Sequence, residues 1–178
     1  MGLLNHQLLL QSFTSDVMKE NVKRLELFDM YHCLRDSSLS SAIKTQEVLG
    51  SVPVAFVEWI KICNGGLLFD TVILSENCYD EEFDLDFETF DEYNTDEVKS
   101  QMFLPAGYSV FAVRSYGDPI CFNNANNDDK IYLWDIEESV FSEIWDSFED
   151  WLTDEIDTAI QLIGDGVLEP LEIKLDNK

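Results

Sequence analysis

Apolar residues recur at intervals of three and four along four stretches of this chain, and that spacing predicts helices. The stretches are residues 14–34, 41–49, 53–63 and 147–164. In the first, Leu27, Met30, Tyr31 and Leu34 continue the helical spacing to its end, and "RDSSLSS", residues 35–41, follows as a loop by composition.

Local residues mark where several helices begin or end. Pro53 stands near the first helical position, where a missing N–H costs nothing. Asn64, Gly65 and Gly66 are expected to end that helix, with at least one of them in the left-handed conformation that glycine tolerates. Thr89 and Glu92 have the spacing of a capping box and predict a fifth helix reaching about residue 102.

Runs rich in β-branched and aromatic residues predict strands in the rest of the chain. They read "LLFDTVIL", "YSVFAVRS", "DPICFN" and "KIYLWDIE", and "VFSEIW" is a further strand or a bridge. The short connections "SYGDP" and "NANNDD" predict antiparallel hairpins. Residues 82–88, "EFDLDFE", alternate as a half-buried strand does, although Phe83, Phe87 and Phe90 also fit one face of a helix.

This order of elements predicts an α+β fold, a central antiparallel sheet flanked by N-terminal helices and closed by a C-terminal helix. We expect one globular unit in which residues 1–36 form a helical extension and residues 37–178 form the α+β domain.

Charge divides the chain in two. The formal net charge is −25, yet residues 1–61 hold six Lys and Arg against seven Asp and Glu. Residues 62–178 hold five against twenty-nine, and residues 62–98 and 131–173 contain no Lys or Arg. Direct binding to nucleic acid is not expected, because phosphate contacts need clustered basic residues. The acidity indicates either a solubility feature or a basic protein partner.

Candidate chemistry is sparse. Cys33, Cys63, Cys78 and Cys121 form no C-x-x-C pair and are expected to be reduced core thiols, Cys63 in a helix and Cys121 in a strand. The two histidines, His6 and His32, lie in the N-terminal extension, with His32 placed on its helix. No zinc ligand set, phosphate-binding loop or distinctive carboxylate pair is present, so no cofactor, metal or catalytic residue is predicted.

One loop invites comparison with a calcium site. In residues 123–135, Asn124, Asn126 and Asp128 alternate and Asp135 comes last. The position that calcium loops give to glycine is Asp129, and strands rather than helices flank the loop. A hairpin turn explains its composition better.

The N-terminal sequence gives no address outside the cytoplasm. "MGLLNHQLLLQSF" lacks a basic start and its apolar run is broken, so no signal peptide is predicted. Gly2 would suit myristoylation, but position 6 is His6 rather than Ser or Thr. No apolar run approaches the length of a transmembrane helix, and we expect a cytoplasmic protein that does not bind membranes.

Two long segments carry a further signal: "SAIKTQEVLGSVPVAFVEWIKICNGGLLFD", residues 41–70, and "YSVFAVRSYGDPICFNNANNDDKIYLWDIEESVFSEIWDSFEDWL", residues 108–152. Together they resemble the SUKH superfamily. The resemblance implies a non-enzymatic α+β protein, most simply a bacterial immunity protein that neutralises a toxin domain, or else an intracellular regulatory scaffold. Residues matching family positions, with an expected structural role, are Pro53, Asn64, Gly65, Gly66, Gly117 and Asp118.

The most acidic segment, residues 75–98, holds eleven Asp and Glu, five Phe and Tyr, and no basic residue. We expect it to be either solvated surface or the face that receives a basic, nuclease-type toxin. If the segment is a toxin-binding face, the predicted partner-binding residues are two aromatic anchors and six acids. They are Tyr79, Tyr116, Asp80, Glu81, Glu82, Asp84, Asp86 and Glu88. The oligomeric state is not predicted.

Overall fold

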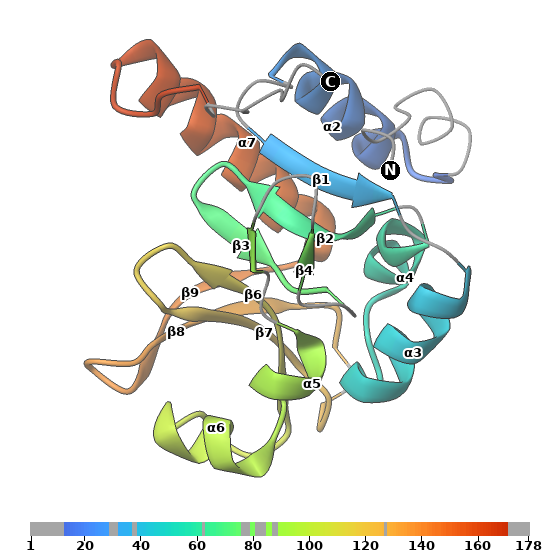
Figure 1. Ribbon diagram of the computed structural model, residues 1–178, viewed down its shortest axis with the longest axis vertical. Coiled ribbons are helices and arrows are strands. Elements are labelled where there is room, and N and C mark those ends of the chain that lie inside the picture. The colour runs from blue at the N-terminus through green and yellow to red at the C-terminus, as the bar shows by residue number, and fades with distance from the viewer. Residues whose placement is uncertain are drawn as a thin grey trace.

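Most strands of the protein belong to one antiparallel sheet. The structure, a computed structural model, describes residues 13–28, 32–36, 39–61, 63–75, 79–80, 85–86, 89–126 and 128–170. Within these residues the sheet has seven strands in the order β1-β2-β3-β6-β7-β8-β9, and β4 and β5 pair separately (Figure 1). The predicted α+β class, with helices flanking an antiparallel sheet, is confirmed.

The strands of the large sheet are β1 (His32–Asp36), β2 (Cys63–Leu68), β3 (Thr71–Ile73), β6 (Tyr108–Arg114), β7 (Pro119–Asn123), β8 (Ile131–Asp135) and β9 (Val140–Trp145). The small pair is β4 (Tyr79–Asp80) and β5 (Leu85–Asp86). The helices are α2 (Asp16–Leu27), α3 (Leu39–Leu49), α4 (Val54–Ile60), α5 (Phe90–Tyr93), α6 (Asp96–Gln101) and α7 (Phe148–Gly164).

A cluster of aromatic rings joins the helices to one face of the sheet. Phe56 of α4 lies with its ring centroid 5.1 Å from that of Phe111, 4.7 Å from Phe122 and 5.2 Å from Phe148 of α7. Phe111 also meets Trp151 edge-on at 5.1 Å. All five side chains are almost fully buried, so this cluster is the centre of the core.

The opposite face of the sheet is covered as well. Side chains alternate between faces along a strand, so Trp134 of β8 lies on the face opposite to Ile131 and Leu133. The Trp134 Nε1 donates to the carbonyl oxygen of Met102, just after α6, at 2.9 Å. Figure 1 shows α5 and α6 at the end of the molecule away from α2 and α7. Burial on both faces makes β6 and β7 nearly continuous apolar strands.

The N-terminal helix α2 packs along α7 (Figure 1). Asn21 is buried and its Nδ2 donates to Thr153 Oγ1 at 2.9 Å, while Arg24 forms an ion pair with Asp157. The chain just before α2 is attached to α4, because Thr14 Oγ1 donates to a Glu58 carboxylate oxygen at 3.0 Å. Polar contacts therefore fix α2 against the two helices that carry the aromatic cluster.

The prediction of one helix over residues 14–34 was wrong in its second half. The helix begins as expected, with Ser15 Oγ accepting from Met18 N, but it ends at Leu27. Residues 32–36 are instead strand β1, in which His32 faces Leu68 and Leu34 faces Gly66 of β2. His32 is therefore not on a helix, and pairing with a distant strand overrides the local apolar spacing. The predicted loop at 35–41 is also shorter, because α3 starts at Leu39.

The Asn64-Gly65-Gly66 segment does not end a helix. The helix before it stops at Ile60, and these three residues lie inside strand β2, together with Cys63. Gly65 has φ +76°, and a Cβ there would lie 2.6 Å from the Leu74 carbonyl oxygen, so the position requires glycine because the backbones approach closely. A left-handed conformation in this segment was predicted correctly, but the predicted reason for it, the end of a helix, was wrong.

Two further boundaries differ from the sequence prediction. "LLFDTVIL" is a hairpin rather than one strand, because Phe69 and Asp70 form a turn between β2 and β3 with Phe69 at φ +56°. The helix predicted over residues 89–102 is divided into α5 and α6 by Asn94 and Thr95. The division lets the Asn94 side chain bond Val110 of β6 in both directions, at 2.9 Å each.

Several local signals were read correctly. Thr89 and Glu92 form the capping box, and Ser147 Oγ caps α7 by accepting from Asp150 N. Gly50, at φ +79°, follows α3, and Pro53 precedes the first residue of α4. The hairpins β6–β7 and β7–β8 pair antiparallel as predicted, and "VFSEIW" is a strand, β9.

Candidate protein-interaction surface

The acidic strand predicted over residues 82–88 is described only in part. The backbone of Tyr79 and Asp80 lies in β4, and that of Asp86 in β5, with Tyr79 facing Asp86 across the pair. Glu81, Glu82, Asp84 and Glu88 lie outside the described residues. Strand character is thus present at Leu85 and Asp86, and the predicted recognition face stays a prediction.

Tyr116 occupies the turn between β6 and β7, well away in sequence from β4 and β5. Its side chain is 67% exposed, as an interface anchor would need to be in the unbound protein. Partial burial raises the pKa of Tyr116, with Arg114 opposing that shift and Asp118, Asp70 and Glu143 adding to it. The carboxylates near this exposed ring give the turn an acidic setting.

The matching family positions Gly117 and Asp118 shape the same turn. Gly117 has φ +106° with open space around it, so the turn conformation and not crowding favours glycine there. The Asp118 backbone oxygen accepts from Arg114 N at 2.9 Å, and its side chain accepts from Ile136 N at 3.2 Å. Asp118 therefore connects the β6–β7 turn to the start of the β8–β9 turn.

The acidic surface that the structure describes most fully covers β9, α7 and the turn between β8 and β9. Residues 131–173 contain no basic side chain. The exposed carboxylates of this region, which we call the α7–β9 surface, are those of Glu137, Glu138, Glu143, Asp146, Asp150, Asp154, Asp157, Asp165 and Glu169. The sequence shows this span without basic residues, but the aromatic content of residues 79–88 placed the predicted site there, and no residue of the α7–β9 surface was predicted.

The bases of the acidic half with described side chains are engaged within the fold. Arg114 binds Glu155, Lys130 Nζ lies 3.0 Å from an Asp146 carboxylate oxygen, and Lys99 is half-buried. Burial lowers the pKa of Lys99. Lys130 offsets one carboxylate of the α7–β9 surface and Arg114 offsets the buried Glu155, so most exposed carboxylates of that surface have no ion-pair partner among these three bases.

The Arg114–Glu155 pair is buried between β6 and α7. Arg114 nitrogens lie 2.6 and 2.7 Å from the two Glu155 carboxylate oxygens, and Thr71 Oγ1 donates to Glu155 at 3.0 Å. Burial raises the pKa of Glu155 to about 7, against the opposing effects of Arg114 and Thr71. The pair is a structural contact between sheet and helix, with Asp70 at 3.6 Å from Arg114 on its outer side.

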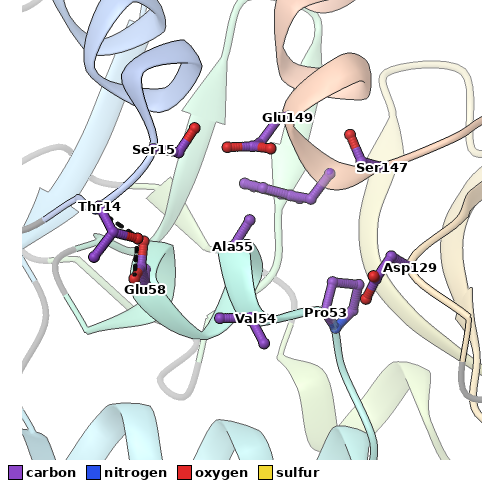
Figure 2. A pocket seen from close by; sticks show the side chains of 10 residues that line it. Thr14, Ser15, Pro53, Val54, Ala55, Glu58, Asp129, Ser147 and Glu149 are labelled. Atoms are coloured by element: carbon purple, nitrogen blue, oxygen red, sulfur yellow. Dashed lines mark hydrogen bonds between the residues drawn. The ribbon is translucent and has the colours of Figure 1, made fainter.

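A pocket of about 240 Å³ opens where the first residues of α2, α4 and α7 meet (Figure 2). Glu149 points into it from α7, and Glu58 lies across from it beside Thr14 (Figure 2). Glu149 Oε1 is buried and takes no hydrogen bond from the described residues. With Asp129 also at its rim, the pocket suits hydrogen-bond donors or cationic groups rather than anions. Its residues are too far apart in sequence to be predicted as a group.

The described side chains do not meet the requirements of a metal site. Among them, no group of three or more His, Cys, Asp and Glu could hold a metal ion. In the loop compared above to a calcium site, Asn123 Oδ1 accepts from Ala125 N at 3.1 Å and Asp128 accepts from Lys130 N and from Tyr132 OH. These side chains close the hairpin turn.

The described thiols are buried. Cys121 donates to the Pro119 oxygen, Cys63 donates to the Gly65 oxygen, and burial raises the pKa of Cys121 well above that of a free thiol. A thiol held protonated in this way is a poor nucleophile. Cys33 lies in β1, and Cys78 falls outside the described residues. Among the described helices, each is too short or too polar to cross a bilayer.

Comparison with known proteins gives one match. The model of the SMI1 / KNR4 family (SUKH-1) matches residues 43–154. No curated protein and no solved structure matches the chain. The matched range runs from α3 into α7 and spans more than half of the sequence, including every strand from β2 to β9. The chain therefore belongs to the SMI1 / KNR4 family (SUKH-1).

Proposed function

We propose that this protein is a cytoplasmic immunity protein that binds and neutralises a basic, nuclease-type toxin domain. Membership in a family that is generally non-catalytic fits a protein-binding role. The buried thiols and the absence of a metal-ligand group among the described side chains give no competing chemical role.

The observation that carries this proposal is the one-sided charge of the molecule. Residues 62–178 carry a net charge of −24, and the nearest described base of the α7–β9 surface, Lys130, is paired with Asp146. A nuclease carries a basic surface because it must bind phosphates. An acidic protein can cover that surface and thereby exclude the nucleic acid.

The physical advantage lies mainly in the rate of encounter. A pair of exposed charges in water at 4 Å interacts by only about 1 kcal/mol. A surface potential built from many carboxylates can raise association rates by about 10- to 1,000-fold at low salt. Rapid capture suits a protein that must neutralise an enzyme before it damages the cell.

Within this proposal, the residues named from the sequence keep their assigned roles. Tyr79 and Tyr116 are the aromatic anchors, and Asp80, Glu81, Glu82, Asp84, Asp86 and Glu88 receive basic side chains. Support for Tyr116 comes from its exposure and its acidic neighbours. Reversal of three of these charges, Glu82→Lys, Asp84→Lys and Asp86→Lys, is expected to slow association and reduce its salt dependence.

A co-expression rescue tests the function itself. The open reading frame beside this gene is expressed with and without the full-length protein, and surviving cells are counted. Rescue from a lethal neighbour is the expected result. A harmless neighbour, or one that kills regardless, would contradict the proposal and favour the other function implied by the family resemblance, a regulatory scaffold.

A further inference from the structure

Strand β9 ends the sheet, and its outer edge has no partner among the described residues. It pairs only with β8 there, and its six residues are exposed or half-exposed throughout. Val140 is 50% exposed and Ile144 is 55% exposed, so both side chains are accessible to a partner. The outer edge of such a strand offers a row of backbone N–H and C=O groups for pairing.

The strand is held firmly in position on its inner side. The Phe141 ring lies 4.7 Å from that of Tyr108 and 4.9 Å from that of Trp134, measured between centroids. On the other face, Trp145 Nε1 donates to Asp154 of α7 at 3.1 Å. An edge fixed in this way loses little conformational entropy when another strand pairs with it.

The register of β9 places different chemistry on its two faces. Leu133 faces Glu143 and Trp134 faces Phe141, so Ser142 is an extra residue in a β-bulge. Facing residues share a side of the sheet, so Glu143 lies on the α7 side and Ile144 on the side of Tyr132. An added strand would therefore meet the Glu143 carboxylate on one face of the sheet and the Ile144 side chain on the other face.

The charges around the outer edge of β9 indicate which kind of strand could pair with it. Around the edge are Glu137 and Glu138 in the turn before β9, Glu143 within it and Asp146 just after it. Lys130 is the nearby base, and it is engaged with Asp146. A second copy of this chain would bring two net charges of −25 together, and its own Glu143 would lie near the first. A segment rich in Lys and Arg gains from the same charges.

We propose that the outer edge of β9 receives an extended basic segment of the toxin as an eighth strand of the sheet. This inference rests on the proposed function and adds a second contact, at β9, to the residues already assigned to toxin binding. Backbone hydrogen bonds along the edge provide affinity. Glu143, with the acids of the adjoining turn, selects basic side chains, and Ile144 contacts an apolar one.

Hydrogen exchange is the direct test. Amides of residues 140–145 in the full-length protein are followed by mass spectrometry, alone and bound to the toxin domain encoded by the adjacent gene. We expect slower exchange in β9 on binding. A complex that forms without added protection in β9 would overturn this inference and leave the proposed function standing. No complex at all would overturn both.

A matched pair of variants tests the side chains. The double variant Glu143→Lys/Ile144→Lys is expected to weaken toxin binding by at least about 10-fold. The control Glu97→Lys/Val54→Lys makes the same charge change at exposed positions on α6 and α4, and is expected to weaken it by about twofold. Equal losses in both variants would contradict a site at β9.

Light scattering tests whether a second copy of this chain, and not the toxin, occupies the outer edge of β9. The protein is expected to be monomeric in 0.5 M salt, where repulsion between copies is largely screened (~3–5 Å Debye length). A dimer under these conditions, with β9 amides protected, would show that a second copy occupies the edge and would overturn the inference.

Discussion

Residues 1–61 and residues 62–178 build one hydrophobic core but differ sharply in net charge. The first part is nearly neutral at −1 and supplies α2, α3 and α4, whereas the second carries −24 and supplies most of the sheet and α7. Phe56 of the neutral part packs directly against Phe111, Phe122 and Phe148 of the acidic part. The interior is therefore shared, and the charge difference is a property of the surface.

This difference teaches that the acidity is not required by the fold. A core of this kind tolerates many surface charges, because exposed charges contribute little to stability individually. Repulsion within the second part still opposes folding.

The largest effect is expected where the two parts meet. Phe56→Ala removes the ring shared by three aromatic partners and should lower the free energy of unfolding by about 3–5 kcal/mol. Urea denaturation followed by tryptophan fluorescence would measure it. Val54→Ala, two residues earlier on the exposed side of α4, is the control and should change stability by less than about 0.5 kcal/mol. Similar losses in both would show that α4 does not pack as described.

Next in size is the buried ion pair of the acidic part. Arg114→Met leaves the Glu155 carboxylate without its partner and should cost about 3–5 kcal/mol when that carboxylate is charged. Unfolding in urea at pH 8 measures this cost. Replacing both residues, Arg114→Met with Glu155→Leu, should recover most of the stability, since no charge is then buried. Failure to recover would mean that the pair is not the source of the loss.

The same glutamate predicts a pH dependence. Its pKa is raised from 4.5 in the unfolded chain to about 7 in the folded protein, so folding favours the protonated form. Its contribution to stability therefore declines as pH rises from about 4.5 to about 7 and is constant above that range. Compared with Glu155→Gln, the wild type should gain stability between pH 8 and pH 5. An unchanged difference between the two proteins would contradict the raised pKa.

A smaller effect is expected from the two serine caps, one in each part. Ser15 and Ser147 each accept a hydrogen bond from a backbone N–H at the start of α2 and α7. Ser→Ala at either should cost about 1 kcal/mol, and Ser→Gly only a few tenths, about 0.3 kcal/mol. Thermal unfolding of the four variants gives the comparison. A loss at Ser147 far above that at Ser15 would contradict equal capping roles, because both serines line the same pocket.

The smallest effect on stability is expected from removing exposed charges from the surfaces of the two parts. Glu137→Gln/Glu138→Gln removes two charges from the acidic part, and Glu26→Gln/Glu47→Gln removes two from the neutral part. The first pair should stabilise the protein slightly at low salt, by about 0.5 kcal/mol or less, because it relieves repulsion. The second should do so less. Melting temperatures in low and high salt test this, and equal effects would remove the distinction between the two surfaces.

Signals that lie within a few residues predicted this fold well. The Thr89–Glu92 capping box, the Ser147 cap and the β6–β7–β8 hairpins each depend on neighbours in sequence. Prediction failed where a distant segment decided the structure. Residues 32–36 continue a helical apolar pattern, yet they pair with β2, some 30 residues further on. Gly65 resembles a helix end locally, while its real constraint is the backbone of Leu74.

For the candidate surface, too, local sequence features were predictable and long-range arrangements were not. Composition alone revealed an acidic protein and therefore the kind of partner to expect. It did not reveal which carboxylates share a surface, because Glu143 of β9 and Asp154 of α7 come together only through the packing of Trp145 on α7. Nor did it reveal that β9 forms an edge, since strand order is set by the whole sheet.

The strand order also has a consequence for how the chain folds. Strands β6 to β9 follow one another in sequence and in space, so residues 108–145 can form by short loop closures. Joining β3 to β6 instead closes a connection from Ile73 to Tyr108, which costs more chain entropy. We expect pulsed hydrogen exchange during refolding to protect β7 and β8 before β1 and β2. Strands β6 to β9, all in the acidic part, would then be the template on which β1, β2 and the neutral part assemble, although charge repulsion opposes folding most in the acidic part.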